Sequence, residues 1–353
     1  MSKKYKIGIT LGDINGIGPE VVLKTLSEPR VLNSCIPIIY GSGKVLGYHK
    51  NILKDSSLSF VTVSNPKQAQ EGKISVINTY HDTVNINLGK ATAESGKFAY
   101  VCLDAAVNDL HSGTIDGLVT GPINKKAMAM ADFPEKGHTE YIAKKVGDEE
   151  PLMFMVSDDL KVAVATAHIP LQNVAKTLTK ELIEEKILAM NTSLKQDFGK
   201  DKPLVAVMGL NPHASDNGTI GNEEEEYIEP VIMALKEKGV MVSGPHSADG
   251  FFGSGEHVKY DGVLAMYHDQ GLIPFKSLCF GQGVNFTAGL HVIRTSPDHG
   301  TGYEIAGNNE ADPASFRTAL FTALDIIRSR SSYTELRENA LQKGEGEKKK
   351  KEK

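Results

Sequence analysis

The stretch DGVLAMYHDQGLIPFKSLCFGQGVNFTAGLHVIRTSPDHGTGYE, residues 261–304, holds the features that decide the fold and the site. Its apolar run at 262–266 is typical of a short buried strand, and His268 and Asp269 follow that strand directly. Further polar residues lie among glycines in the same stretch: Lys276, Asn285, Arg294, His299 and Gly300. Side chains that bind metals, transfer protons and hold anions are concentrated here, which indicates a functional site rather than packing alone.

Two earlier segments repeat the pattern of a strand followed by a histidine. The apolar run KVAVA at 161–165 leads to His168, and LVAVM at 204–208 leads to His213. Helical stretches separate these strands, so the sequence predicts an α/β fold with a mostly parallel sheet. Because ligands bind beyond the carboxyl ends of parallel strands, we expect His168, His213 and His268 at one edge of that sheet.

The other segments follow the same alternation of strands and helices. The expected strands are 5–11, 36–41, 59–63, 74–78 and 116–120, and the expected helices begin at Pro19 and within 137–141 and cover 92–111, 178–197, 222–238 and 313–328. Thr139 suits a helix cap, and the acidic run Glu223–Glu226 suits a solvated first turn. The loop GDINGIG at 12–18 either cradles an anion or makes a tight turn, because it is neither a dinucleotide fingerprint nor a P-loop.

Length and composition limit the class of protein. The chain has 353 residues, more than one hydrophobic core usually serves, so two lobes are expected. A net charge of −5 gives no sign of a nucleic-acid partner, and neither a membrane span nor a signal peptide is expected. Three cysteines without CxxC spacing are typical of reduced thiols in a cytoplasmic protein. The charged tail at 340–353 is expected to be disordered.

The candidate residues are compatible with more than one chemistry. Three imidazoles suit a divalent metal and leave positions for a substrate, although without an HExxH or paired CxxC motif the metal hypothesis depends on the fold. Asp249 and Asp269 could transfer protons, orient a partner or cap a turn. Lys276 and Arg294 could bind phosphate or carboxylate, or form surface salt bridges. A metal-dependent phosphohydrolase and a non-catalytic sensor of phosphorylated metabolites therefore stay open beside an oxidoreductase.

A resemblance to a known family covers roughly residues 5–330. The chain resembles 4-hydroxythreonine-4-phosphate dehydrogenase, an enzyme family of pyridoxal phosphate biosynthesis. The motifs that carry the resemblance stand in the family's order: GDINGIGPE, GPINK, GHTEY, ATAHIPL, GLNPHA, MYHDQGLIPFK, GVNFTAGL and RTSPDHGTGYEIAG. Several such motifs in order are much more specific than any one of them.

The resemblance implies an isocitrate/isopropylmalate dehydrogenase-like fold with two α/β lobes and an active-site cleft between them. The first lobe would comprise 1–135 with 290–335, and the second, 136–289, would carry the metal ligands and dimer contacts. The family works as a homodimer with its active site at the interface. It uses NAD or NADP and one divalent cation, such as zinc, magnesium or cobalt, per subunit.

Residue by residue, the resemblance assigns three groups. The metal ligands match His168, His213 and His268, contributed across the dimer interface; the substrate residues match His138, Thr139, Lys276, Asn285 and Arg294; and the turn at His299 and Gly300 is similar to a nucleotide-binding loop. The base that removes the hydroxyl proton would be Asp249 or Asp269.

The implied reaction is the oxidation of 4-phosphooxy-L-threonine to 2-amino-3-oxo-4-phosphooxybutanoate, which loses carbon dioxide to give 3-amino-2-oxopropyl phosphate. Related family members oxidise other phosphorylated hydroxy acids, such as 4-phosphothreonate or 4-phosphoerythronate. Two segments depart from the family pattern. ASDNGTIG after His213 lacks a Gly-Glu pair, and GDINGIG carries Ile14 and Asn15 where Pro-Ala is usual.

Overall fold

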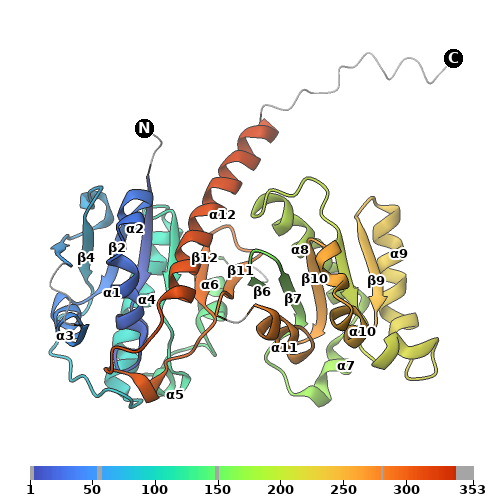
Figure 1. The fold of residues 1–353 in the computed structure, drawn as a ribbon, viewed down its shortest axis with the longest axis horizontal. Helices are drawn as coiled ribbons and strands as arrows, with labels where there is room; N and C mark the ends of the chain where they lie inside the picture. The colour runs from blue at the N-terminus through green and yellow to red at the C-terminus, as the bar shows by residue number, and fades with distance from the viewer. Residues whose placement is uncertain (1–3, 54–57, 148–150, 280, 339–353) are drawn as a thin grey trace.

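A single twelve-stranded sheet runs through the molecule, flanked by helices on both faces (Figure 1). The computed structural model describes residues 4–53, 58–147, 151–279 and 281–338. The strands lie in the order β3-β4-β2-β1-β5-β12-β11-β6-β7-β10-β8-β9. Their bounds are β1 Tyr5–Thr10, β2 Cys35–Gly41, β3 Phe60–Thr62, β4 Ile74–Asn78, β5 Gly117–Thr120, β6 Leu152–Val156, β7 Lys161–Thr166, β8 Val205–Met208, β9 Val242–His246, β10 Gly262–Tyr267, β11 Val284–Ala288 and β12 Arg294–Pro297.

The helices alternate with the strands along most of the chain. Their bounds are α1 Gly18–Leu26, α2 Pro29–Ser34, α3 Gly43–Leu53, α4 Ala93–His111, α5 Lys125–Met130, α6 His138–Val146, α7 Val174–Thr177, α8 Lys180–Gln196, α9 Glu229–Glu237, α10 Ala248–Gly253, α11 His268–Leu278 and α12 Ala314–Glu338. A π-helical turn, η4 (Glu224–Ile228), runs directly into α9, and short 3-10 turns lie at 66–68, 171–173, 212–216, 256–259 and 303–305.

Two parallel halves of the sheet meet at an antiparallel centre. Strands β3, β4, β2, β1, β5 and β12 pair in parallel, as do β7, β10, β8 and β9. Between them β11 runs antiparallel to β12 and β6, and β6 runs antiparallel to β7. The expected mostly parallel sheet is therefore confirmed, while the lobe boundaries at 135/136 and 289/290 stay a prediction.

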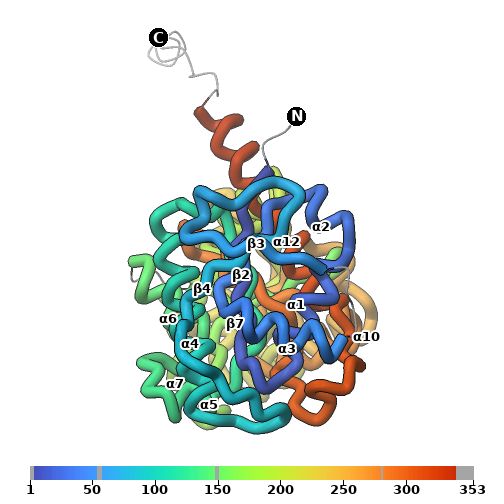
Figure 2. Tube along the Cα trace, turned by 90° about the vertical axis from the view of Figure 1, so that its left-hand side faces the viewer, coloured from blue at the N-terminus to red at the C-terminus, as the bar shows by residue number. Residues whose placement is uncertain are grey.

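Burial on both faces explains the continuous apolar runs in the sequence. All seven residues of β2 are buried. In β7, Ala163 and Ala165 pack in the larger core, whereas Val162 and Val164 pack in a second core on the opposite face. Figure 2 looks along the sheet from its first half, with α1 and α3 on one side of the strands and α4 on the other.

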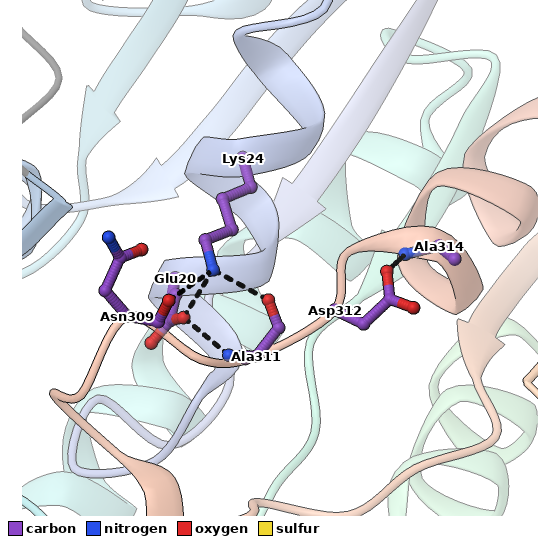
Figure 3. A network of polar contacts seen from close by, with 6 residues as sticks. All are labelled: Glu20, Lys24, Asn309, Ala311, Asp312 and Ala314. Carbon is purple, nitrogen blue, oxygen red and sulfur yellow. Dashed lines mark hydrogen bonds and ion pairs between the residues drawn. The ribbon is translucent and has the colours of Figure 1, made fainter.

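Hydrogen bonds hold the segment between β12 and α12 against α1 and the loop before it. Glu20, which is almost fully buried, accepts hydrogen bonds from Lys24 Nζ and from the backbone N–H of Ala311, each at 2.8 Å (Figure 3). Lys24 Nζ also donates to the carbonyls of Asn309 and Ala311, at 3.1 and 2.8 Å. Further along, Ile17 N–H donates to the Thr301 carbonyl at 2.8 Å. The loop that carries residues 299–307 is thereby held against the loop at 12–18.

Loop 12–18 is compact for a steric reason. Gly12 has φ +68°, and a Cβ there would lie 2.2 Å from the Pro122 carbonyl oxygen, so only glycine fits. Pro19 lies in the first turn of α1, as expected. Asp13 is buried and accepts from Tyr303 Oη at 2.7 Å and Ser95 Oγ at 3.2 Å. Burial raises the Asp13 pKa, and these hydrogen bonds partly offset that shift.

Several expectations about local structure were wrong. The last helix was expected to end at 328 but continues to Glu338, and its final turns extend away from the body of the molecule (Figures 1 and 2). The run Glu223–Glu226 is not a fully solvated turn, because Glu224 has no exposed surface. Strands β6, β9, β11 and β12 were not expected. The tail predicted at 340–353 lies outside the described residues.

Two further expectations can be compared with the structure. Cys35, Cys102 and Cys279 are all free thiols, as the absence of CxxC spacing predicted. None of the helices in the described part of the chain is both long and apolar enough to cross a membrane.

Candidate active site

A cavity of about 300 Å³ opens where the two halves of the sheet meet. It is lined by the loop after β5, the start of α6, His168 from the loop after β7, and the central strands β11 and β12 with the loop that follows β12. Its lining includes all but one of the predicted substrate and nucleotide residues, namely His138, Thr139, Asn285, Arg294, His299 and Gly300, together with the predicted metal ligand His168. The cations Lys125 and Lys136 also line it, against the carboxylates of Glu140 and Asp298. With Arg294 the lining has three cations against two carboxylates, and this excess of positive charge favours an anionic ligand.

Arg294 is the most informative residue of this cavity. It begins β12 in the centre of the sheet and is 3% exposed. Its Nε and Nη2 donate to Thr120 Oγ1 at 3.0 and 2.7 Å, and its Nη1 donates to Thr287 Oγ1 at 3.2 Å. Burial lowers the Arg294 pKa to about 10, partly offset by the charge of Glu140. None of the hydrogen-bond partners found for this guanidinium among the described residues is a carboxylate, so an anionic ligand would stabilise the buried charge.

His138 is held in one protonation state by the same guanidinium. Arg294 Nη2 lies 3.1 Å from His138 Nδ1, and a guanidinium can only donate, so Nδ1 must accept. Burial and then the charge of Arg294 hold the His138 pKa well below its usual value. The neutral ring therefore carries its proton on Nε2, where it can be offered to a ligand oxygen.

Thr139 lines the cavity and does not cap α6. The N-cap is Gly137, and it makes no side-chain capping bond, so the alternative of a helix cap at Thr139 was wrong. Because Thr139 lines the cavity, its hydroxyl can contact a ligand there. Glu140, the next residue, lies 3.8 Å from His168 Nδ1. Its interaction with His168 is the largest cause that lowers the Glu140 pKa.

Two polar atoms at the cavity have no partner among the described residues. Asn285 Oδ1 and His299 Nε2 are both buried without a hydrogen bond. Buried polar atoms are normally satisfied, so these two atoms mark positions where a ligand donor or acceptor fits. Lys276, by contrast, forms an ion pair with Asp298 at 3.1 Å. It reaches the cavity only through that carboxylate.

The structure brings together two of the three predicted metal ligands. Strand β10 lies between β7 and β8, so the three histidines follow neighbouring parallel strands. The rings of His168 and His268 have centroids 5.9 Å apart. His268 Nδ1 lies 2.7 Å from Asp269 Oδ1, an arrangement that leaves Nε2 free for a metal. Within one copy of the described chain, no three His, Cys, Asp or Glu residues are grouped closely enough to hold a metal.

His213 lies in a separate, larger pocket of about 540 Å³ with Asp249 and Asp269. Asp249 accepts a hydrogen bond of 2.5 Å from Ser247 Oγ, which is the main cause that lowers the Asp249 pKa. A general base works best with a pKa near the working pH, so this carboxylate is a weak base in the state described. Asp269 is occupied with His268, which suits an orienting role.

Sequence reasoning missed Thr120, Thr287, Glu140 and Asp298. Thr120 and Thr287 are strand residues, and nothing in their local sequence indicates that both face one guanidinium. Glu140 directly follows His138 and Thr139, and that adjacency is a signal that could have identified it.

Comparison with known proteins places the chain. A family profile described as pyridoxal phosphate biosynthetic protein PdxA matches residues 33–323. The chain belongs to the PdxA family. A 4-hydroxythreonine-4-phosphate dehydrogenase of Bacteroides thetaiotaomicron is 48% identical to this PdxA-family chain over 341 residues, 96% of the chain and 93% of the relative. The protein of the same name from Aquifex aeolicus is 41% identical and covers 91% of the chain and 98% of itself.

Solved structures agree with this membership. The 4-hydroxythreonine-4-phosphate dehydrogenase of Klebsiella pneumoniae superposes with a TM-score of 0.81 at 33% identity, covering 92% of the PdxA-family chain and 99% of that structure. The predicted isocitrate/isopropylmalate dehydrogenase-like α/β fold is confirmed by this likeness and by the putative enzyme of Salmonella typhimurium, with a TM-score of 0.82 at 35% identity, covering 92% of the chain and 100% of that structure.

Proposed function

We propose that the chain oxidises the secondary hydroxyl of 4-phosphooxy-L-threonine with NAD or NADP, in pyridoxal 5'-phosphate biosynthesis. The names of its relatives support this reaction. The structural observation that carries the proposal is the buried Arg294, whose hydrogen-bond partners among the described residues are all neutral, in a cavity with several cations. A substrate with a phosphate and a carboxylate suits that cavity, since guanidinium groups bind both anions.

The chain's own side chains would hold the substrate in place. Arg294 and Lys125 would bind anionic ends, His138 Nε2–H and the Thr139 hydroxyl would donate to oxygens, and the unpaired Asn285 Oδ1 would accept from the substrate's ammonium or hydroxyl group. Lys276 would join them by exchanging Asp298 for a substrate anion. Positioning of this kind contributes up to roughly 7–11 kcal/mol to lowering a reaction barrier.

A divalent cation such as zinc, magnesium or cobalt fits the His168 and His268 pair. Both rings are partly exposed, and Asp269 orients one of them, as expected of a metal-binding imidazole. Bound there, the metal would act as a Lewis acid toward the developing alkoxide. His213 would be the third ligand, and because it lies in another pocket, we propose that a second copy supplies it in a homodimer with its active site at the interface.

The nicotinamide cofactor would accept the hydride, and a protein base the hydroxyl proton. His299 and Gly300 would contact the cofactor, because both line the cavity and His299 Nε2 is buried there without a hydrogen-bond partner among the described residues. Of the two candidate bases, Asp269 is tied to His268, and Asp249 is exposed beside His213. We propose Asp249 for proton removal, since it lies beside His213 and since a substrate that covers it would raise its pKa by desolvation. The product would be 2-amino-3-oxo-4-phosphooxybutanoate, which decarboxylates to 3-amino-2-oxopropyl phosphate.

We propose that the enzyme works in the cytoplasm, in keeping with three free thiols. The division into lobes at 1–135 with 290–335 and at 136–289 would place the cavity in the cleft between them.

One incubation series tests the proposal. The full chain is mixed with a divalent cation, NAD or NADP, and in turn 4-phosphooxy-L-threonine, 4-phosphothreonate or 4-phosphoerythronate. Formation of reduced nicotinamide with the first substrate is the expected result. Faster turnover of an acid without the amino group would reassign the substrate within the same chemistry. Release of inorganic phosphate without reduction of the nicotinamide would support a phosphohydrolase, and thermal stabilisation without turnover would support a sensor.

A further inference from the structure

A left-handed turn presents His213, and its conformation is unusual for L-amino acids. His213, Ala214, Ser215, Asp216 and Asn217 all have positive φ, between 48° and 68°. None of the five is glycine, although side chains disfavour this region of φ. Such a conformation persists only where the surrounding structure determines it. Something outside the turn must therefore hold it.

Glu224 makes the contacts that fix the start of this turn. Its carboxylate is fully buried. Oε1 accepts the backbone N–H of Asn211 at 2.7 Å, and Oε2 accepts Asn211 Nδ2 at 2.9 Å. Asn211 Nδ2 also donates to Glu223 Oε2 at 2.7 Å, and the Asn211 carbonyl accepts from Ala214 N–H at 3.1 Å. Both oxygens of the buried Glu224 carboxylate thus accept hydrogen bonds from Asn211, which lies two residues before His213.

Close packing restricts the backbone conformations that are open to the turn at 213–217. A Cβ at Gly209 would lie 2.9 Å from Ala214 Cα and 3.1 Å from Glu224 Oε1, so the turn and the carboxylate both press on the backbone at 209. On the other side, Gln270 Nε2 donates to the Gly209 carbonyl at 2.6 Å, and its Oε1 accepts Met266 N–H at 2.7 Å. The turn is thereby tied to the strand end that leads to His268.

We propose that Glu224 is a positioning residue of the metal centre, which acts through Asn211 to hold the left-handed turn and so to fix where His213 points. The inference rests on the proposed function, because it requires that His213 binds the metal. It assigns the carboxylate no contact with metal or substrate. Its effect is the preorganisation of a ligand.

The test compares Glu224→Gln with Glu226→Gln by titrating each full-length protein with Co²⁺ and recording its visible absorption spectrum. Glu226 is exposed in the same helical turn, so its replacement removes the same formal charge without touching Asn211. We expect Glu224→Gln to weaken Co²⁺ binding about tenfold to a hundredfold and to change the spectrum, while Glu226→Gln matches the wild type. Both are measured well below their thermal midpoints, where loss of stability alone does not alter the affinity.

Two further variants separate the possible failures. Asn211→Ala keeps Glu224 and the backbone bond and removes the side-chain bonds, so it should also weaken Co²⁺ binding, and it serves if Glu224→Gln does not fold. His213→Ala tests the ligand itself. Wild-type binding in His213→Ala would overturn the metal centre and this inference with it. Loss of binding in His213→Ala, with wild-type binding in folded Glu224→Gln or Asn211→Ala, would overturn this inference alone.

Discussion

Replacing Thr120 with valine would remove the hydroxyl that accepts two hydrogen bonds from the buried Arg294. Valine keeps the size and shape of the side chain, which has no exposed surface, but offers no acceptor. The Arg294 Nε and Nη2 bonds, at 3.0 and 2.7 Å, would both be lost. A hydrogen bond to a charged group contributes about 1.5–3 kcal/mol, so the variant should lose about 3 kcal/mol of unfolding free energy or more.

Thr120→Ser is the matched control, because it keeps the hydroxyl and loses only a methyl group, which costs about 1 kcal/mol. Denaturant unfolding gives the free energies, and steady-state kinetics gives KM. We expect Thr120→Val to be about 2 kcal/mol less stable than Thr120→Ser and to have the higher KM for the phosphorylated substrate. Equal stability and equal KM in the two variants would show that this hydroxyl does not hold the guanidinium.

The other predictions concern a buried histidine, a helix crossing and the anion-binding group. Burial lowers the His49 pKa from 6.5 to about 4, and a backbone hydrogen bond opposes this shift to a smaller extent. Between these two pH values the unfolded chain binds a proton at His49 and the folded chain does not. The free energy of unfolding should therefore fall by about 1.4 kcal/mol per pH unit as the pH is lowered from 6.5 to about 4. Denaturant unfolding across that window should show a shallower slope for His49→Asn, and an unchanged slope would disprove the assignment. Gly96→Ala places a Cβ 2.0 Å from the Ala127 carbonyl oxygen, where α4 meets α5, and should lower the free energy of unfolding by about 2 kcal/mol or more. Gly47→Ala lies in a helix with open space around the new methyl group, and it should raise the free energy of unfolding by about 0.5–1 kcal/mol. Similar thermal midpoints for the two variants would contradict this prediction. Arg294→Lys loses the forked geometry and should lower kcat/KM by roughly thirtyfold, about 2 kcal/mol, with wild-type kinetics as the contrary result.

Most strands of the two parallel halves were predictable because they are buried on both faces, whereas the less buried β9 and the polar β12 were missed. Segments such as 36–41 and 262–266 are continuous apolar runs and were found within a residue or two. The strands at the centre of the sheet were harder to predict from the sequence. β11 and β12 carry Asn285, Thr287 and Arg294, polar residues that a sequence pattern assigns to loops.

Long-range contacts set the limit for the candidate site. The rule about strand ends placed His168 and His268 near each other, but it did not show that His213 sits on a left-handed turn that directs it to another pocket. That conformation depends on Glu224, which a local reading treats as a solvated helix start. Hydrogen bonds between distant parts of the chain determine both the turn at His213 and the burial of Glu224, and local sequence periodicity does not predict such bonds.

Mixing inactive variants tests most directly whether His168 and His268 of one copy share a metal with His213 of another. In a twofold dimer, a pair of one His168→Ala chain and one His213→Ala chain keeps one intact site, so a statistical mixture should regain about a quarter of the wild-type activity. A mixture of His168→Ala with His268→Ala should regain none, because each site then lacks one of the two ligands that lie in the same copy. Recovery in the second mixture, or none in the first while wild-type chains remix and stay active, would contradict the account.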